Sequence, residues 1–137
     1  MMEIIERLPD FRVTYRFFTT EEGGRNLLPL QGYRSDWIYA EDYYEEGAKS
    51  PSSISTFGIH PRFVDENGLI YSAQEIAPRQ GFADMFILFN GMRSEHRRRI
   101  KIGTKGYFVE GPWLVAEATV IDILYLNHTE HERKIQY

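Results

Sequence analysis

The fold is best predicted from residues 19–37, which read TTEEGGRNLLPLQGYRSDW. Gly23 and Gly24 supply the positive φ angles that a tight or bulged loop needs. Pro29 stands where the next strand is expected to begin, a position at which proline is tolerated. The stretch therefore predicts the end of one strand, a loop that turns at the glycines, and a second strand over residues 30–39.

The rest of the chain predicts more short strands separated by turns. Residues 11–20 alternate apolar and polar side chains, which is typical of a half-buried strand. Turn signals such as Asn90-Gly91 and Gly111-Pro112 separate the later segments. Those segments are expected at residues 59–64, 69–76, 84–89, 96–105, 107–110 and 113–126.

These strands define the predicted fold class. Residues 84–89 are apolar on both faces, so this strand is expected in the interior of the sheet. No amphipathic helix is predicted anywhere in the chain. Many short strands without helices favour an all-β protein, an antiparallel barrel or sandwich. We expect one domain over residues 1–126, followed by a polar tail at 127–137.

Composition narrows the function class. The chain has 137 residues, of which 15% are aromatic, and it contains no cysteine. Thiol chemistry and disulfides are thereby excluded. The formal net charge of −4 counts mildly against a dedicated nucleic-acid binder, although a local basic patch would override it. No apolar run approaches the ~18 residues that a membrane helix needs, so no membrane partner and a cytoplasmic location are expected.

Four elements of residues 19–39 occur together in one known family. They are Glu22-Gly23-Gly24-Arg25, then Pro29, then Gly32-Tyr33-Arg34, then the aromatic strand with Trp37 and Tyr39. In this order they resemble the C-terminal, third domain of the elongation factor Tu family. Residues 106–111 and 114–120 resemble the closing strand pair of that domain, and residues 78–84 more loosely resemble its Pro-Gly-Asp turn.

The resemblance implies a fold and a kind of partner. The third domain is a β-barrel that contacts the transfer RNA stem and the nucleotide-exchange factor. No phosphate loop of the type Gly-x-x-x-x-Gly-Lys-Ser/Thr occurs in this chain, so no nucleotide is expected to bind. The resemblance therefore implies a stand-alone binding barrel without the GTPase domain. Free-standing proteins similar to this domain occur in bacteria.

The first candidate site for RNA or phosphate combines Arg25, Tyr33 and Arg34. Two guanidinium groups and a stacking ring next to a glycine loop suit a nucleic-acid backbone. The alternative is that the glycines only shape the loop, while both arginines pair with nearby carboxylates.

A second candidate surface contains Arg97, Arg99 and Lys101. If residues 96–105 form a strand, these three side chains project from one face as a positive stripe. The alternative is a charged edge strand that resists pairing with other chains.

The third candidate is an acidic, tyrosine-rich loop that suits a protein interface. Its rings would anchor a partner while its carboxylates steer a basic surface, and the alternative is a solvated loop. The predicted interface residues are Tyr39, Tyr43, Tyr44, Glu45 and Glu46, with Glu41 and Asp42 beside them.

No catalytic constellation, metal site or cofactor is predicted. The four histidines are scattered, and His60 and His96 have no partner at a recognisable spacing. Three hypotheses follow: a non-catalytic module that binds structured RNA or a protein, a protein-only regulator resembling an antitoxin or immunity inhibitor, and an enzyme or small-ligand carrier. The third hypothesis requires a deep pocket with convergent polar groups.

Overall fold

The computed structural model describes residues 7–45 and 55–129. Their six strands form one antiparallel sheet in the order β2-β5-β6-β1-β4-β3. The strands are β1 (Phe11–Phe17), β2 (Asp36–Tyr39), β3 (Ile59–Val64), β4 (Gln80–Ile87), β5 (Lys105–Glu110) and β6 (Trp113–Ile123). The helices are α1 (Ala40–Glu45), the 3-10 helix η2 (Asn90–Met92) and α2 (Arg93–Arg99).

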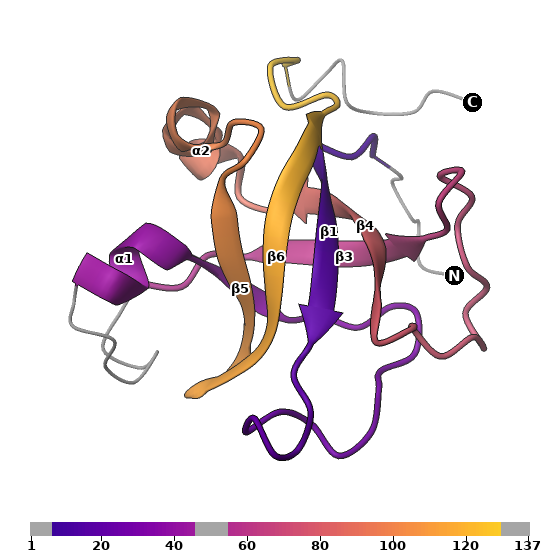
Figure 1. Ribbon diagram of the computed structural model, residues 1–137. Helices are drawn as coiled ribbons and strands as arrows, with labels where there is room; N and C mark the ends of the chain where they lie inside the picture. The colour runs from indigo at the N-terminus through magenta and orange to yellow at the C-terminus, as the bar shows by residue number, and fades with distance from the viewer. Residues whose placement is uncertain (1–6, 46–54, 130–137) are drawn as a thin grey trace, which may run out of the picture.

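The sheet curls into a half-barrel. Figure 1 shows β5, β6 and β1 side by side, with β3 crossing behind them. The two outer strands approach each other, since Trp37 of β2 and Phe57, just before β3, exchange backbone hydrogen bonds of 2.9 and 2.8 Å. The predicted antiparallel β fold is confirmed as a curled six-stranded sheet, whereas the expectation of an all-β protein without helices is not met. No helix among the described residues is long and apolar enough to cross a membrane.

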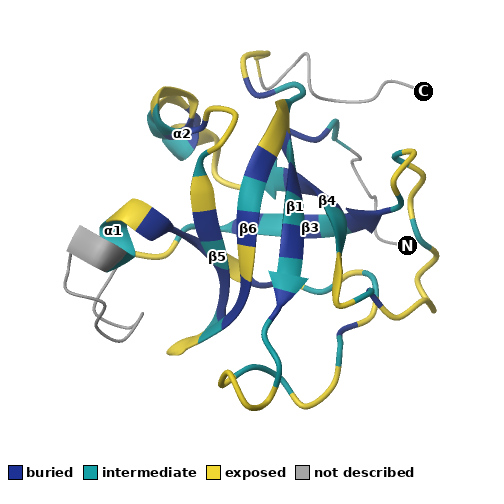
Figure 2. Cartoon of the chain, in the orientation of Figure 1, coloured by how far each residue is buried: buried dark blue, intermediate teal, exposed yellow. Residues whose placement is uncertain are grey.

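Aromatic side chains fill the inside of the curl. The alternation predicted for β1 is confirmed, because Val13, Tyr15 and Phe17 are buried while the residues between them are half-exposed. The Tyr15 ring centroid lies 5.2 Å from that of Phe63 and 6.0 Å from that of Phe108, within the range of favourable aromatic contacts. Figure 2 shows these buried positions recurring along the strands, whereas the loops are exposed.

Several other predicted strands are confirmed. The last two segments form the β5–β6 hairpin, and β6 is the longest strand described. β4 lies between β1 and β3, as expected for a segment that is apolar on both faces, although it begins four residues earlier than predicted and ends at Ile87. β3 matches its predicted bounds and forms one edge of the sheet, where Pro61 is tolerated.

The predicted strand over residues 30–39 is wrong in its first half. Gly32 has a φ of 91°, and the Tyr33 amide donates to the Leu30 carbonyl, so the chain turns before β2 begins at Asp36. The turn places the side-chain amide of Gln31 against β3. The Phe63 amide donates to Gln31 Oε1 at 2.8 Å, and Gln31 Nε2 donates to the Phe63 carbonyl at 2.8 Å.

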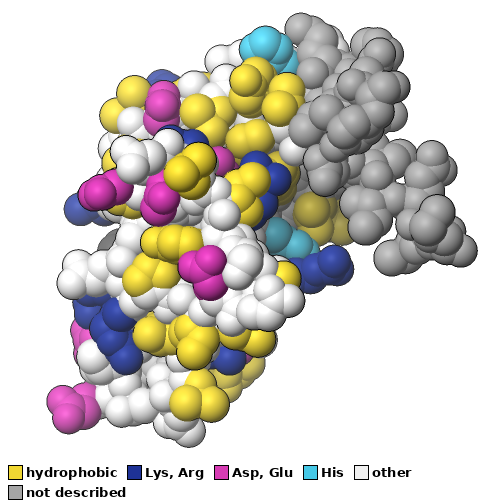
Figure 3. All heavy atoms as spheres, turned by 90° about the vertical axis from the view of Figure 1, so that its right-hand side faces the viewer, with side chains coloured by type: hydrophobic (Ala, Val, Ile, Leu, Met, Phe, Trp, Pro, Cys, Tyr) yellow, Lys and Arg dark blue, Asp and Glu magenta, His cyan; other side chains and the backbone are white. Residues whose placement is uncertain are grey.

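The predicted strand over residues 69–76 is absent. Only isolated bridges form there, Val64 with Ile70 and Leu30 with Ile76. A turn interrupts the segment, because the Glu75 amide donates to the Ser72 carbonyl. Several apolar side chains of this part of the chain are therefore exposed, and hydrophobic side chains are spread over the face in Figure 3.

Two segments predicted as a loop and a strand are helices. The acidic segment forms α1, where Glu41 and Asp42 lie in the first turn and interact favourably with the positive end of the helix dipole. The segment predicted as a charged strand forms α2, followed by a turn. Arg93 and His96, three residues apart on one helical face, are both buried, which the strand prediction did not anticipate.

Arg93 attaches α2 to the sheet. Its side chain is 2% exposed and lies 3.3 Å from the fully buried Asp10 carboxylate. The same guanidinium donates to the Leu126 carbonyl at 2.7 Å and to the His128 carbonyl at 2.8 Å. One buried arginine therefore ties the start of α2 to the chain before β1 and to the turn after β6.

Candidate functional site

Arg25 and Tyr33, two of the predicted RNA contacts, converge on one carboxylate. Arg25 Nη1 donates to Glu110 Oε2 at 2.9 Å, and the Tyr33 hydroxyl donates to the same oxygen. The Arg25 guanidinium also lies 5.0 Å from the centre of the Tyr33 ring. Burial, followed by the bond to Glu110, raises the pKa of the Tyr33 phenol above its ordinary value. The pair therefore fastens the glycine loop to β5, and Glu110 balances the charge of Arg25.

The glycines of that loop have a structural role. Gly23 has a φ of 93°, and a Cβ at Gly24 would overlap the Phe18 carbonyl. Glu22 in the same loop accepts two hydrogen bonds from Arg16, at 2.8 and 2.9 Å. Those bonds, with a further one from the Thr19 amide, lower the pKa of Glu22 to about 2. The loop is thus held by its own polar contacts.

The predicted stripe of Arg97, Arg99 and Lys101 does not form, because these residues lie on α2 and in the turn after it. Arg97 Nε donates to the Leu126 carbonyl at 2.9 Å. Arg99 lies 3.8 Å from the centre of the Tyr39 ring. Lys101 is exposed, and its backbone amide donates to Thr104. The three side chains therefore have different environments.

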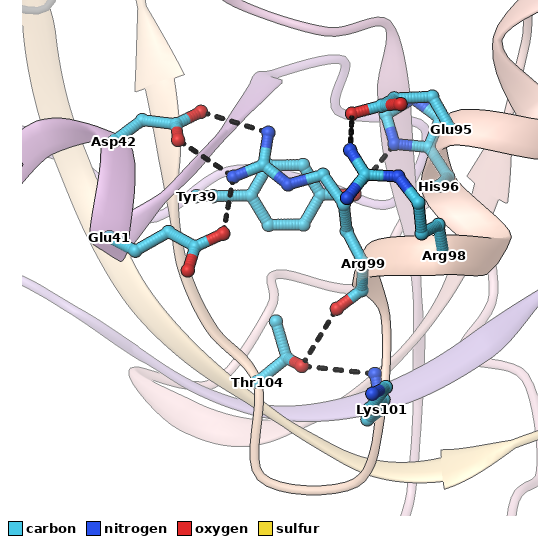
Figure 4. A network of polar contacts seen from close by, with 9 residues as sticks. All are labelled: Tyr39, Glu41, Asp42, Glu95, His96, Arg98, Arg99, Lys101 and Thr104. Atoms are coloured by element: carbon cyan, nitrogen blue, oxygen red, sulfur yellow. Dashed lines mark hydrogen bonds and ion pairs between the residues drawn. The ribbon is translucent and has the colours of Figure 1, made fainter.

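Arg99 also neutralises part of the predicted acidic interface. It donates to Asp42 at 2.7 and 3.1 Å and to Glu41 at 2.5 Å, as Figure 4 shows. Tyr39 is buried, so it is not available as an anchor, whereas the Tyr43 ring is half-exposed and packs on Tyr107. The side chains of Tyr44 and Glu45, and the whole of Glu46, lie outside the described residues.

A different group of basic side chains gathers at the edge of the sheet. We call this site the β3 groove; its volume is about 580 Å³. Its basic and aromatic lining residues are Arg7, Tyr33, Arg34, His60, Arg62 and Phe86. They come from the start of the chain, the turn before β2, the edge strand β3 and the end of β4.

The β3 groove arises from strand alternation and a turn. His60 and Arg62 are two residues apart on β3, so both point away from the core, where Ile59 and Phe63 are buried. The Arg62 guanidinium lies 4.7 Å from the centre of the Phe86 ring on the neighbouring strand. Arg34 is exposed and has no ion pair or hydrogen bond with any residue in the described ranges.

Charges of both signs act on His60 in the β3 groove. Burial lowers the pKa of His60 below its ordinary value; the charge of Asp36 opposes this, and the charge of Arg34, with a smaller effect, lowers the pKa further. His60 is therefore mostly neutral at pH 7, and a bound anion would favour its protonation. Arg34 alone among the predicted site residues contributes its charge here. The signal that identifies His60 and Arg62 is their alternation on a strand that the sequence did predict.

Comparisons with known proteins add no family to this description. Neither the protein-family models nor the curated proteins searched include a match to the chain. The candidate function consequently rests on the residues and their geometry.

Proposed function

We propose that this chain is a non-catalytic binding module that holds the phosphate backbone of a structured RNA in the β3 groove. Arg34 carries the proposal, because its side chain is exposed and forms no ion pair with a carboxylate of the described residues. Arg25 and Arg99, in contrast, are each paired with carboxylates of the chain.

The chemistry of the β3 groove suits RNA. Arginine binds phosphate through two parallel hydrogen bonds, and its charge is retained at any physiological pH. Tyr33 and Phe86 line the same groove, and the Phe86 ring supports the Arg62 guanidinium at 4.7 Å. Gln31 lines the same groove, where its side-chain amide is bonded to the backbone of Phe63 and Tyr71.

We also propose that the half-barrel is related to the third domain of elongation factor Tu, as a stand-alone form. The six-stranded antiparallel sheet and the sequence from Glu22 to Arg34 support this relation. If the chain descends from a barrel that contacted transfer RNA, it is expected to retain a basic surface. The proposed partner is accordingly an RNA stem of the transfer RNA kind.

A protein-only regulator acting through the acidic tyrosine-rich segment has less support. Arg99 pairs with Glu41 and Asp42, which reduces the negative field at α1. The burial of Tyr39 removes one of the predicted anchors. A pull-down with and without nuclease distinguishes this alternative from RNA binding.

The test is fluorescence anisotropy with labelled transfer RNA, for the wild-type protein and for Arg34→Ala. We expect the variant to bind roughly tenfold more weakly and its salt dependence to fall by about one unit of slope, as for one lost phosphate contact. Arg98→Ala is the matched control, because Arg98 is an exposed arginine of α2 outside the groove. Equal affinities of Arg34→Ala and Arg98→Ala would contradict the proposal.

A pull-down from bacterial lysate, with and without nuclease, separates RNA from protein partners. Captured RNA that nuclease removes supports RNA binding. A single protein partner that survives nuclease and is lost on replacing Tyr43 would instead support the regulator.

A further inference from the structure

A smaller pocket, separate from the β3 groove, lies between η2, α2 and the chain that leads into β3. Its volume is about 300 Å³. Phe57, Ile87, Phe89 and Met92 form apolar walls, Thr56 lines its exposed side, and His96 supplies a buried polar group. We call it the His96 pocket.

His96 is fixed by Tyr39. The imidazole is 1% exposed, and its Nδ1 lies 2.6 Å from the Tyr39 hydroxyl, a contact visible in Figure 4. Burial raises the pKa of this phenol above its ordinary value, so the hydroxyl keeps its proton. We take the hydroxyl as the donor to Nδ1, which accepts through its lone pair in this tautomer. The ring proton is then on Nε2.

His96 lines the pocket, and in this tautomer its Nε2 carries the ring proton. Burial lowers the pKa of His96 to about 4, with the charge of Arg99 adding to the effect, so the ring is neutral at pH 7. Nε2–H donates to no residue of the described ranges. The Phe57 and His96 rings are perpendicular, with their centroids 4.9 Å apart, and Phe57 forms part of the surrounding apolar wall.

We propose that the His96 pocket binds a small, uncharged aromatic molecule with one hydrogen-bond acceptor, which receives the Nε2–H of His96. An apolar cavity of about 150 Å³ holds a benzene ring, so twice that volume admits one ring with a short substituent. Apolar walls with one well-placed polar group are typical of small-molecule sites, and 300 Å³ is at the lower end of their range. A charged ligand is disfavoured, since these walls offer no counter-charge.

The test uses acetophenone, which has one ring and one carbonyl acceptor, and ethylbenzene, which has the ring alone. Each is titrated into the full chain while ¹⁵N and ¹H resonances of the His96 imidazole and the Met92 methyl group are recorded. We expect saturable shifts with acetophenone, at both residues, and about tenfold weaker binding of ethylbenzene, as for one lost hydrogen bond.

A blocking variant gives an independent measurement. Thr56→Trp places a large ring at the exposed side of the pocket without altering His96, and we expect it to abolish acetophenone binding. Thr20→Trp, in an exposed turn elsewhere, is the matched control and should bind normally. Absence of saturable shifts up to the solubility limit, equal affinity for the two probes, or binding that persists in Thr56→Trp would each overturn the proposal.

Discussion

The two basic regions of the molecule use their arginines differently. The α2 region, Arg93 to Arg99, holds four arginines in seven residues, and each is bonded to a carboxylate or carbonyl of the chain. The β3 groove draws its basic residues from separate segments, and Arg34 has no such partner among the described residues. The dense run of arginines in α2 therefore bonds to the protein itself. Basic residues from separate segments form the candidate binding surface.

The comparison predicts that the largest loss of stability follows from replacing Arg93. Arg93→Met leaves the buried Asp10 carboxylate without its cation and removes the donors to the turn after β6. We expect the free energy of unfolding to fall by about 3–5 kcal/mol, the usual cost of breaking a buried ion pair on one side. Urea denaturation provides the measurement. Arg98→Met, whose side chain is 71% exposed, should change stability by less than about 0.5 kcal/mol, and similar losses in both variants would refute the contrast.

The next effect is a pH dependence that originates in the α2 region. The folded state keeps His96 neutral down to its pKa of about 4, whereas the unfolded chain protonates it near its ordinary value of 6.5. The unfolded state thus binds more protons between these values, and the free energy of unfolding falls as pH decreases through this window, by on the order of 3 kcal/mol. Urea midpoints measured from pH 7 to pH 4 should decline less steeply in His96→Gln. If the urea midpoint declines equally steeply in His96→Gln, titratable groups other than His96 cause the decline.

We expect replacement of Arg99 to lower the free energy of unfolding moderately and to change the affinity for RNA little. Arg99→Ala removes the ion pairs to α1 and the contact with the Tyr39 ring. We expect a loss of about 1–2 kcal/mol, as for a partly buried charged pair with a cation–π contact. Thermal unfolding and the transfer RNA assay should be run on this variant with Lys101→Ala as control. A marked loss of RNA affinity in either variant would restore the predicted basic stripe as a binding surface.

The smallest expected effect is a change in the pKa of His60 in the β3 groove. Arg34 lowers the pKa of His60 through its charge, so Arg34→Ala should raise that pKa, by less than burial lowers it. Titration of the His60 imidazole by NMR measures the change directly. Addition of inorganic phosphate should raise the pKa of His60 in the wild-type protein and have less effect in Arg34→Ala. A His60 pKa that responds to neither change would show that the charge of Arg34 does not act on His60 or on an anion in the groove.

Local sequence patterns predicted the strands well where the alternation was unambiguous. Val13, Tyr15 and Phe17 identified β1, and the Gly111-Pro112 turn separated β5 from β6. The same logic failed at residues 96–105, where Ile100 and Ile102 imitate strand alternation. The helix α2 is attached to the sheet through Arg93 and Asp10, which are distant in the chain, so local alternation could not reveal this contact.

The candidate sites were less predictable than the fold. Arg34 was identified from its motif, but the motif did not indicate that Glu110 would pair with Arg25 across 85 residues of sequence. His60 and Arg62 meet Arg34 because Gln31 bonds to β3, a side-chain contact with no signature in the sequence. Charge neutralisation and site assembly both depend on long-range contacts, which short motifs do not encode.

The bonds of Gln31 have a consequence for how copies of this protein meet. An outer strand with unpaired amides is a template on which a second chain can add a strand, the first step towards aggregation. Along β3 the Gln31 side chain occupies the polar groups of Phe63, Pro61 has no amide hydrogen, and the Ile59 amide is bonded to the Phe57 carbonyl. Together with the Tyr71 amide, which also donates to the Phe63 carbonyl, the Gln31 side chain and Pro61 leave few backbone groups of β3 to which a second chain could bond.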